Sequence, residues 1–482
     1  MLNWLFKRRK ESQQPRSLRD TRARAKTRTL EAGKTDRLNQ LHWTDASDVG
    51  INTFLGEYLP TVRARATYEA LHNPNVEGVI ATHIDDVIGP GGPILQVLST
   101  NKKYNAALEQ VWRDWWAMPD ITGLQSGPEL LGLCIRMLWL CGEYLVQEVT
   151  DGDGNGPVSL KLKALHPRRL ETPTDKTQDN VTLGIKRTQL GRPTTYYIES
   201  TPDNESLTSM QMNFVGRSAK RIIHGFQLVE PDQARGVPWL TSCLPTVADL
   251  RDYDTQVLDA ARAAADMGVY LSTKHPDAAY VDLAEDDNIE IERRMLTALP
   301  SGWEPNQITP QQPSTRYIEY RAERLRDLGR PHGMPLMMVQ LDSGNHNYSS
   351  ARFDAQIYQR GINRLRGWLV RHTLNRLVRD VIVEARLVPG VLPGRPARVD
   401  YQWTWTALPH VDPLKEENAV TERIANGTST YRDECAKKNA DWEEVFDQQK
   451  REMDKRVELG LPILSPKSSL ASDDKDKGAS DA

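Results

Sequence analysis

One long helical pattern, over residues 238–267, limits the possible folds of this chain more than any other feature of its sequence. Its apolar residues recur at helical spacing, and alanines crowd its end before Gly268. An acidic, proline-containing stretch follows, in which 281–292 holds six Asp or Glu residues. The sequence therefore predicts a long helix and then a small, irregular, β-containing insertion. The apolar positions that set the helical period are Leu240, Leu244, Val247, Leu250 and Leu258.

The residues before this helix, 46–235, combine helical and strand patterns. Two helices are predicted over 61–73 and 74–89, separated where Asn73 meets a proline, because proline disfavours a helical conformation in the residue before it. Four strand patterns follow, namely PILQVLS, LVQEV, SLKLKAL and TYYIES, and the glycine-rich turn DGDGNG joins the middle two. This region is predicted to be a mixed α+β domain.

The last third of the chain is predicted to be mainly helical. A shorter helix over 315–329 leads into a polar loop, and a long helix is expected from Ser349 to about Arg386. Two further helical patterns, PLKEENAVTERIANG and DWEEVFDQQKREMDKRVELG, end at Gly427 and Gly460, which are expected to act as C-caps. The tail after residue 465 is rich in Ser, Asp and Lys and is expected to be disordered.

The composition is that of a globular protein. The 482 residues are 39% apolar, which suits two to four domains, and the net charge is −3. The apolar segment in the opening MLNWLFKRRK is too short for a signal peptide. The sequence also contains no apolar run of about 18 residues that could span a membrane. We expect a soluble intracellular protein. Four cysteines without a CxxC pair are expected to be reduced and mostly buried: Cys134, Cys141, Cys243 and Cys435.

Basic charge is concentrated at the start of the chain. Residues 1–40 hold 12 Lys or Arg against 4 Asp or Glu, a net of +8, which leaves about −11 for the remainder. Residues 1–45 also lack apolar periodicity, so we predict a basic, disordered arm. Contact with nucleic acid and plain disorder both fit an arm of this kind.

The polar stretch LDSGNHNYSSAR, at 341–352, contains the Ser, His and Asp types that hydrolases use. Such groups act together only when a fold holds them rigidly on different elements, whereas these are consecutive. Gly, Asn and Ser in a short polar run are typical of a loop before a helix, with Ser349 the best N-cap candidate. We predict a loop and not an active site.

Other candidate motifs fail on a missing residue. DGDGNG matches the first half of a calcium loop, but its twelfth position, which needs a bidentate Glu, is Leu162. GPGGP at 89–93 contains two prolines without backbone N–H groups and is not followed by Lys-Ser/Thr, so it is not a phosphate loop. HExxH and GxSxG are absent. The sequence nominates no catalytic residue, no metal ligand and no cofactor.

Arginines recur along the predicted long helix and point in several directions. Arginines that bind phosphates usually lie on one stripe of a helix, whereas these arginines do not. We therefore predict a solvated or subunit-pairing face, with nucleic-acid contact as the alternative. The arginines are Arg352, Arg360, Arg364, Arg366, Arg371, Arg376, Arg379 and Arg386. The apolar stripe is expected to comprise Phe353, Ile357, Leu365, Leu369, Leu377 and Val381.

Five segments occur in an order that is similar to one known family. They are GEYLVQ (142–147), EPDQARGVPWL (230–240), LPSGWEPNQITPQQP (299–313), NYSSAR (347–352) and DPLKEENA (412–419). NYSSAR after a Gly-Met-Pro helix break at 333–335 is the most specific. Over roughly 55–462 the chain resembles the lambda-type portal proteins of tailed bacteriophages. The basic arm matches nothing in that family, and the helix after NYSSAR lacks its small-residue start.

This resemblance implies an α+β portal fold, assembled as a dodecameric ring at one capsid vertex of the virion. Double-stranded DNA would pass through the ring during packaging and ejection. The implied partners are the terminase large subunit, the major capsid protein, and head-completion and tail adaptor proteins, with assembly in the host cytoplasm. The implied parts are a wing at 46–237, a stem helix at 238–268, a clip at 269–314, a second stem helix at 315–336, a tunnel loop at 337–350, a long wing helix at 351–388, and the remaining wing and helical crown at 389–465.

The tunnel loop implied by the resemblance contains no Lys or Arg and one Asp. A ring multiplies each lining cation by its copy number, so basic residues here would grip DNA and act as a brake. We expect a collar with weak, exchangeable DNA contacts, made by Gln340, Asp342, Ser343, Asn345, His346, Asn347 and Tyr348. The acidic clip is expected to dock terminase and head-completion proteins by charge attraction, through Asp282, Glu285, Asp286, Asp287 and Glu290.

Two other classes of protein compete with this interpretation. A DNA-processing enzyme, such as a nuclease or terminase subunit, needs a Walker A loop or a cluster of metal-binding carboxylates, and a divalent-metal nuclease assay would detect it. A capsid scaffold or adaptor protein should be more helical and lack the strand-rich first third. The expected protein is not an enzyme.

Overall fold

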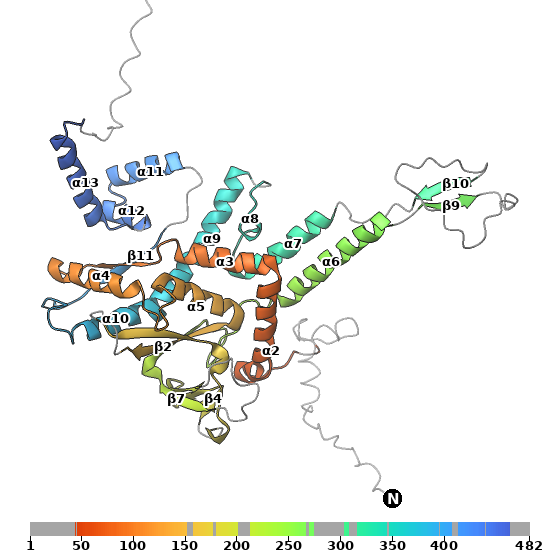
Figure 1. Ribbon diagram of the computed structural model, residues 1–482, viewed down its shortest axis with the longest axis horizontal. Coiled ribbons are helices and arrows are strands. Elements are labelled where there is room, and N and C mark those ends of the chain that lie inside the picture. Colours follow the sequence, from red (N-terminus) through yellow and green to blue (C-terminus); the bar gives the residue numbers. More distant parts are fainter. Residues whose placement is uncertain are drawn as a thin grey trace, which may run out of the picture. The chain divides into compact units, whose positions relative to one another are not determined.

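The computed structural model describes the following residues: 44, 46–151, 158–176, 180–200, 213–266, 269–273, 303–307, 316–344, 347–394, 396–406, 413–438 and 440–462. Internal packing divides the chain into two units, 1–53 and 54–482. In the first unit, the described residues are 44 and 46–53, and the last three of them begin a helix. The second unit contains the other described elements (Figure 1). No helix among the described residues is long and apolar enough to cross a membrane.

Within the described part of the chain, four helices precede the first large sheet: α2 (Ile51–His72), α3 (Pro74–Ile88), α4 (Lys102–Trp116) and α5 (Gly127–Cys141). The predicted break between α2 and α3 is confirmed. Asn73 is extended there (φ −114°), and its side-chain oxygen accepts a hydrogen bond from the Asn75 N–H at 3.1 Å. Helix α2 starts ten residues before the predicted start, and α4 and α5 were not predicted.

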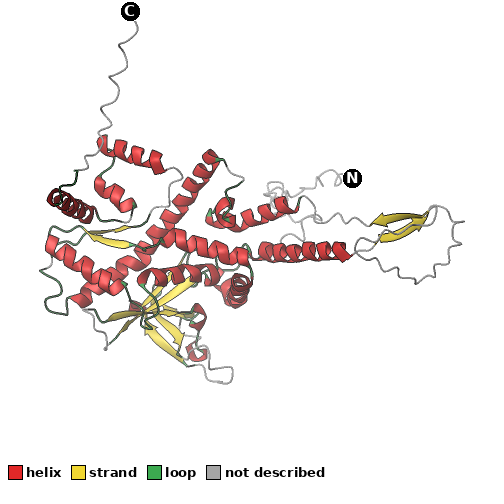
Figure 2. Cartoon of the chain, turned by 45° about the horizontal axis from the view of Figure 1, so that its top comes forward, coloured by secondary structure: helices red, strands yellow, loops and turns green. Residues whose placement is uncertain are grey.

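The described strands form four small antiparallel sheets, and Figure 2 draws these strands in yellow. The three-stranded sheet has the order β3-β2-β8, and the four-stranded sheet has the order β4-β5-β6-β7. Strand β1 pairs with β11, and β9 pairs with β10. The first seven strands are β1 (Ile94–Val97), β2 (Glu143–Thr150), β3 (Leu160–Leu165), β4 (Val181–Thr182), β5 (Ile185–Arg187), β6 (Pro193–Glu199) and β7 (Phe214–Ser218). The others are β8 (Ile222–Phe226), β9 (Val269–Thr273), β10 (Trp303–Gln307) and β11 (Tyr401–Thr404).

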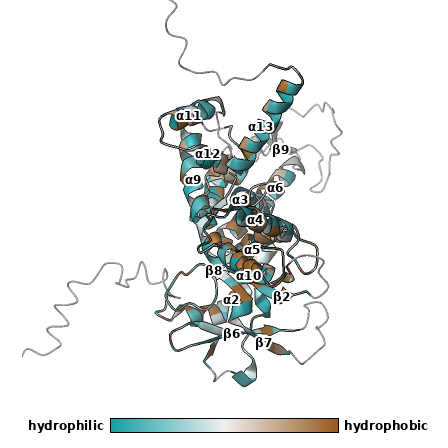
Figure 3. Ribbon diagram, turned by 90° about the vertical axis from the view of Figure 1, so that its left-hand side faces the viewer, coloured by the Kyte–Doolittle hydropathy of each residue, from teal (hydrophilic) through white to brown (hydrophobic). Residues whose placement is uncertain are grey.

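Strand β2 is buried on both faces and separates two cores. Because successive side chains on a strand point to opposite faces, Tyr144 and Val146 join the main core while Leu145 joins a smaller core with Ile185 and Tyr196. The main core gathers helices α3, α4, α5, α9 and α10, and Figure 3 shows hydrophobic residues concentrated around α5 and α10. The four predicted strand segments all contain observed strands, and the fold is α+β as expected.

Helix α6 (Leu244–Asp266) is shorter than the helix predicted at 238–267. The residues before it form turns, in which the Thr241 N–H donates to the Pro238 carbonyl at 3.0 Å. The helix then begins one residue before Pro245, a residue that suits the first turn because it lacks the N–H that would be unpaired there. Strands β9 and β10 lie where the β-containing insertion was predicted, and α7 (Tyr317–Gly329) follows.

The predicted long helix is observed, with one irregular turn. It comprises α9 (Tyr348–Leu369), a π-helical turn (Val370–Leu374) and α10 (Asn375–Ala385), and it is preceded by the short α8 (Leu336–Gln340). Of the predicted apolar stripe, Leu365, Leu369, Leu377 and Val381 are buried. Phe353 and Ile357 are exposed, so the prediction is wrong for these two, because no described element covers that face of α9.

The chain ends in three helices: α11 (Pro413–Ala425), α12 (Tyr431–Lys437) and α13 (Trp442–Glu458). Gly427 and Gly460 have positive φ values (+68° and +67°), as expected for the ends of α11 and α13. Helix α12 was not predicted. All four cysteines are free and three of them are buried, while Cys435 is half-buried.

Candidate functional site

The break before the polar loop is a tight reversal between α7 and α8. Gly333 is left-handed (φ +67°), and the Met334 N–H donates to the Gly329 carbonyl at 3.0 Å. A Cβ on Gly329 would lie 2.5 Å from the Met334 oxygen, so only glycine allows this approach. Met334 and Val339 are buried in the main core, which fixes α8 and the start of the loop.

The described part of the loop is held by local hydrogen bonds. Leu341 ends α8 in a left-handed conformation (φ +50°), and the Asp342 N–H donates to the Met337 carbonyl at 3.1 Å. The Asp342 carboxylate in turn accepts from the Gly344 N–H at 2.8 Å. Residues 341–344 are all exposed. The described part of the loop therefore presents one carboxylate, polar backbone groups and the apolar side chain of Leu341 to its surroundings.

Asn347 caps helix α9. Its side-chain oxygen accepts from the Ser350 N–H at 2.9 Å, and the Ser350 hydroxyl donates back to the Asn347 carbonyl at 3.1 Å. The prediction of Ser349 as the cap is wrong, because the helix begins at Tyr348 and the residue before it supplies the cap.

The loop is shorter than the predicted 337–350, because helix α8 includes its first four residues and α9 its last three. Among the expected DNA-channel residues, Gln340 is half-buried at the end of α8, Asp342 and Ser343 lie in the exposed loop, Asn347 is the cap and Tyr348 opens α9. Asn345 and His346 lie outside the described residues, as do the five expected clip residues Asp282, Glu285, Asp286, Asp287 and Glu290.

Helix α9 is anchored on the end of α3. The Tyr358 hydroxyl donates to Asp86 at 2.9 Å, and the Arg366 guanidinium donates to the carbonyls of Val87 (2.8 Å) and Asp86 (2.9 Å). Burial lowers the pKa of Arg366 to about 10. A cation at the C-terminus of α3 satisfies otherwise unpaired carbonyls, so Arg366 stabilises the fold and is not available to phosphates.

An aromatic cluster joins the elements around the loop. The ring of His332, at the end of α7, lies 4.0 Å from the Trp139 ring of α5 and 5.2 Å from the Trp239 ring before α6. The Trp139 indole donates to His83 of α3 at 3.0 Å. Burial lowers the pKa of His83 to about 3 and that of His332 to about 4, so both rings are neutral at neutral pH.

Two of the segments that carry the family resemblance meet in a buried ionic network. Arg235 of EPDQARGVPWL contacts Glu143 of GEYLVQ at 2.6 Å, and His224 contacts the same carboxylate at 3.0 Å. Burial alone would raise the pKa of Glu143, but Arg235 and His224 lower it to about 2. Arg235 also donates to the carbonyls of Pro167, Leu170 and Leu183. The network fixes the segment that leads into α6.

The first turn of α7 is joined to the middle of α6. The Tyr317 hydroxyl donates to Asp254 at 2.8 Å, and Arg321 lies 3.6 Å from the same carboxylate. On its other side, α6 is joined to α2 by the Arg251–Glu69 ion pair at 2.5 Å. These contacts therefore hold α6 against α7 on one side and against α2 on the other.

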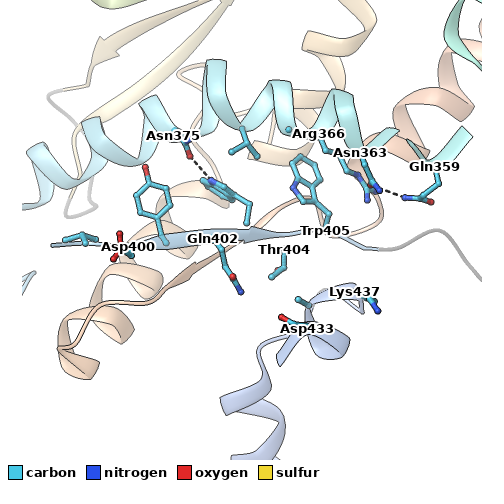
Figure 4. A pocket seen from close by; sticks show the side chains of 16 residues that line it. Gln359, Asn363, Arg366, Asn375, Asp400, Gln402, Thr404, Trp405, Asp433 and Lys437 are labelled. Atoms are coloured by element: carbon cyan, nitrogen blue, oxygen red, sulfur yellow. Dashed lines mark hydrogen bonds between the residues drawn. The ribbon is translucent and has the colours of Figure 1, made fainter. Parts of the chain in front are cut away.

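A pocket of about 750 Å³ lies beside β11, between α9 and α12. Figure 4 shows Asp433 and Lys437 of α12 on one side of the strand and Trp405 on the other, toward α9. The Arg366 guanidinium lies over the Trp405 ring at 5.2 Å. No group of three or more His, Cys, Asp and Glu residues placed to hold a metal ion occurs within the described ranges.

Sequence reasoning did not identify Glu143, Arg235, His332 or the aromatic cluster as important. The first two lie inside quoted family segments, so the signal was their presence in those segments. His332 precedes the Gly-Met-Pro break directly, but nothing in the sequence indicates that its ring would be buried.

The family "Phage portal protein, lambda family" matches residues 37–366 of this chain. That range is more than half of the sequence, so the chain belongs to the lambda family of phage portal proteins, which are head-tail connector proteins. The chain is 22% identical to a probable portal protein of Halomonas phage phiHAP-1, over 90% of this chain and 88% of that protein. It is also 22% identical to portal protein B of Escherichia phage lambda, over 83% of this chain and 84% of that protein.

Solved structures give weaker similarity. The virion of a native gene transfer agent particle contains a chain with a TM-score of 0.45 and 14% identity, over 85% of this chain and 94% of that chain. An HK97 family phage portal protein from Corynebacterium diphtheriae gives a TM-score of 0.31 and 13% identity, over 73% of this chain and 97% of that chain.

Proposed function

We propose that twelve copies of this portal protein form a ring at one capsid vertex, with double-stranded DNA passing through the central channel. The observation that carries the proposal is family membership over 37–366. This range contains the wing, both stem helices, the clip and the tunnel loop that the family resemblance implies. The protein then resides in the virion after assembly in the host cytoplasm. It acts as a structural component and not as an enzyme.

The partners in this proposal follow from the position of a portal. The terminase large subunit and later the head-completion and tail adaptor proteins bind the clip, and the major capsid protein surrounds the ring. The acidic composition of the clip supports attraction to a basic partner surface. Electron microscopy of the purified protein tests the ring directly, since particles with an axial hole are expected and monomers at micromolar concentration would contradict it.

The loop between α8 and α9 acts in this proposal as a collar that slides along DNA. In the described part of the loop, the apolar Leu341 is exposed beside polar and acidic groups, and Asp342 is engaged by the backbone of its own loop. No Lys or Arg occurs over 337–350. Twelve added cations from Asn345→Lys should raise the affinity of the ring for duplex DNA steeply, give it a new salt dependence and slow packaging. His346→Gln keeps a neutral polar group and should package at a near-normal rate.

A packaging assay with assembled proheads separates this collar from a hydrolytic site. Loss of packaging with His346→Gln, together with normal packaging by Asn345→Lys, would contradict the collar. For the clip, replacing Asp286, Asp287 and Glu290 by Asn or Gln should leave rings intact and weaken terminase binding more at low salt than at high salt. Unchanged binding at both salt concentrations would reject that role.

A further inference from the structure

One face of α9 carries exposed apolar and basic residues. Phe353, Ile357, Arg360 and Arg364 follow at spacings of four, three and four, which place them on a single side of the helix. Phe353 is 61% exposed and Ile357 is 44% exposed, and both arginines are exposed as well. We call these four residues the α9 stripe.

The α9 stripe has no partner within the described residues. Neither Arg360 nor Arg364 forms an ion pair or hydrogen bond there, in contrast to Arg366, which is buried against α3. Two unpaired cations beside two uncovered apolar side chains form a surface that a protein partner would stabilise, because such a partner can bury the apolar groups and pair the charges. A DNA backbone would pair only the charges.

Helix α6 carries a stripe of opposite charge. Asp249, Asp252, Gln256 and Asp259 follow at spacings of three, four and three, and all four are exposed. Among the residues that the structure describes, Asp252 and Asp259 pair only with arginines of their own helix, at 3.7 and 3.2 Å, and these exposed pairs are weak. Asp249 has no ion pair within the described residues. We call these four residues the α6 stripe.

The two stripes match in length as well as in charge. At 1.5 Å per residue, the α9 stripe is about 16 Å long and the α6 stripe about 15 Å long. Both are exposed in the single chain, so they do not cover each other within one subunit. In a ring built by rotation, a surface of one copy meets a different surface of the next copy, which is the arrangement that two complementary stripes require.

We propose that the α9 stripe of one subunit docks on the α6 stripe of the neighbouring subunit. Arg360 and Arg364 pair with the aspartates in this contact, and the body of the neighbouring subunit beside its α6 stripe covers Phe353 and Ile357. The proposal depends on the ring described under the proposed function. The two stripes would then form part of the interface between neighbouring subunits of that ring.

Charge reversal tests the contact. The double variant R360E/R364E should raise the concentration needed for half-assembly at least about tenfold, because attraction becomes repulsion at each interface. D249R/D252R should do the same. Combining all four changes should restore assembly, because the charges are again complementary. Light scattering measures the oligomer, and thermal unfolding establishes that each variant is folded.

A matched control reverses two exposed arginines outside the stripe, in R379E/R386E, and should assemble like the wild type. If the wild type forms rings and R360E/R364E assembles equally well, the contact is overturned but the ring remains. If that variant also loses binding to duplex DNA, the arginines are assigned to DNA contact. Failure of the four-fold variant to assemble, while both double variants disassemble, would exclude α6 as the partner surface. A monomeric wild type would contradict the ring itself and the contact with it.

Discussion

Arg235 and Glu143 form a fully buried ion pair, with their charged groups 2.6 Å apart and both side chains at most 3% exposed. The remaining hydrogen-bonding capacity of Arg235 is satisfied by three carbonyls, and Glu143 accepts further hydrogen bonds from His224 and the Gly236 N–H. A buried charge is tolerated only when it is paired in this way. The pair therefore fixes how the strand β2 meets the segment that enters α6.

Breaking this pair should be strongly destabilising. Glu143→Gln keeps the shape but leaves the Arg235 charge buried and unpaired, so the free energy of unfolding should fall by about 3–5 kcal/mol. Urea unfolding measures the loss. The exposed pair of Arg113 and Glu444, at 3.1 Å, supplies the control, and Glu444→Gln should cost less than about 1 kcal/mol. Equal effects of the two substitutions would show that the buried network is not important for stability.

The backbone at the same junction is equally constrained. A Cβ on Gly236 would lie 2.0 Å from the Gly142 carbonyl oxygen, so Gly236→Ala must displace one of the two segments. We expect a loss of about 3 kcal/mol or more from this overpacking, measured by thermal unfolding. Gly78→Ala is the matched control, because Gly78 lies within α3 with no atom within 4 Å of the added methyl group. That change should stabilise by about 0.5–1 kcal/mol, and a loss of stability with it would weaken the steric explanation.

Helix breaks and helix ends were predicted correctly, because they depend on residues that are neighbours in the sequence. The break at Asn73 and the glycines that end α11 and α13 were predicted because turn and cap preferences involve neighbouring residues. Helix α4 was missed although its buried residues Tyr104, Leu108, Val111 and Trp115 do keep helical spacing, so that signal was present in the sequence. Strands β4 and β5, of two and three residues, are too short to show a period.

The site was predicted less completely, for a physical reason. Glu143 and Arg235 are separated by 92 positions, and neither segment indicates by its own sequence that the other will pack against it. The polar loop could be placed, because a run of Gly, Asn and Ser is incompatible with a buried element. Its cap was assigned to Ser349 instead of Asn347, since several residues in the run can cap a helix and only the backbone geometry selects one.

The cap assignment can be tested directly. Asn347→Ala removes the acceptor of the Ser350 N–H and should lower the free energy of unfolding by about 1 kcal/mol, with faster hydrogen exchange in the first turn of α9. Ser349→Ala is the control, because that residue is exposed and already inside the helix, and it should change stability by less than about 0.5 kcal/mol. A larger effect of Ser349→Ala than of Asn347→Ala would reverse the assignment.

The buried histidines predict how stability depends on pH. The folded pKa values of His83 and His332 are lowered to about 3 and about 4, whereas the ordinary value is 6.5. Below pH 6.5 the unfolded chain therefore binds protons that the folded chain does not, and stability falls as the pH drops toward 4. The stability is fully present above pH 6.5. Between about pH 6 and 4, the unfolded chain should bind about two more protons at these residues than the folded chain, and this difference sets the slope of the free energy of unfolding against pH.

His332→Phe isolates one of these contributions. The Nε2 atom of His332 is buried without a hydrogen-bond partner, and three aromatic rings surround the side chain. Phenylalanine therefore fills the position, with the loss of the hydrogen bond that the imidazole makes to the Trp239 backbone. The difference in the free energy of unfolding between pH 7 and pH 4.5 should shrink by roughly 2–3 kcal/mol in this variant. Trp239→Phe changes the packing of the same cluster but keeps both histidines, so its pH dependence should equal that of the wild type. Denaturant unfolding at the two pH values measures both, and an unchanged difference in His332→Phe would mean that His332 does not stay neutral in the fold.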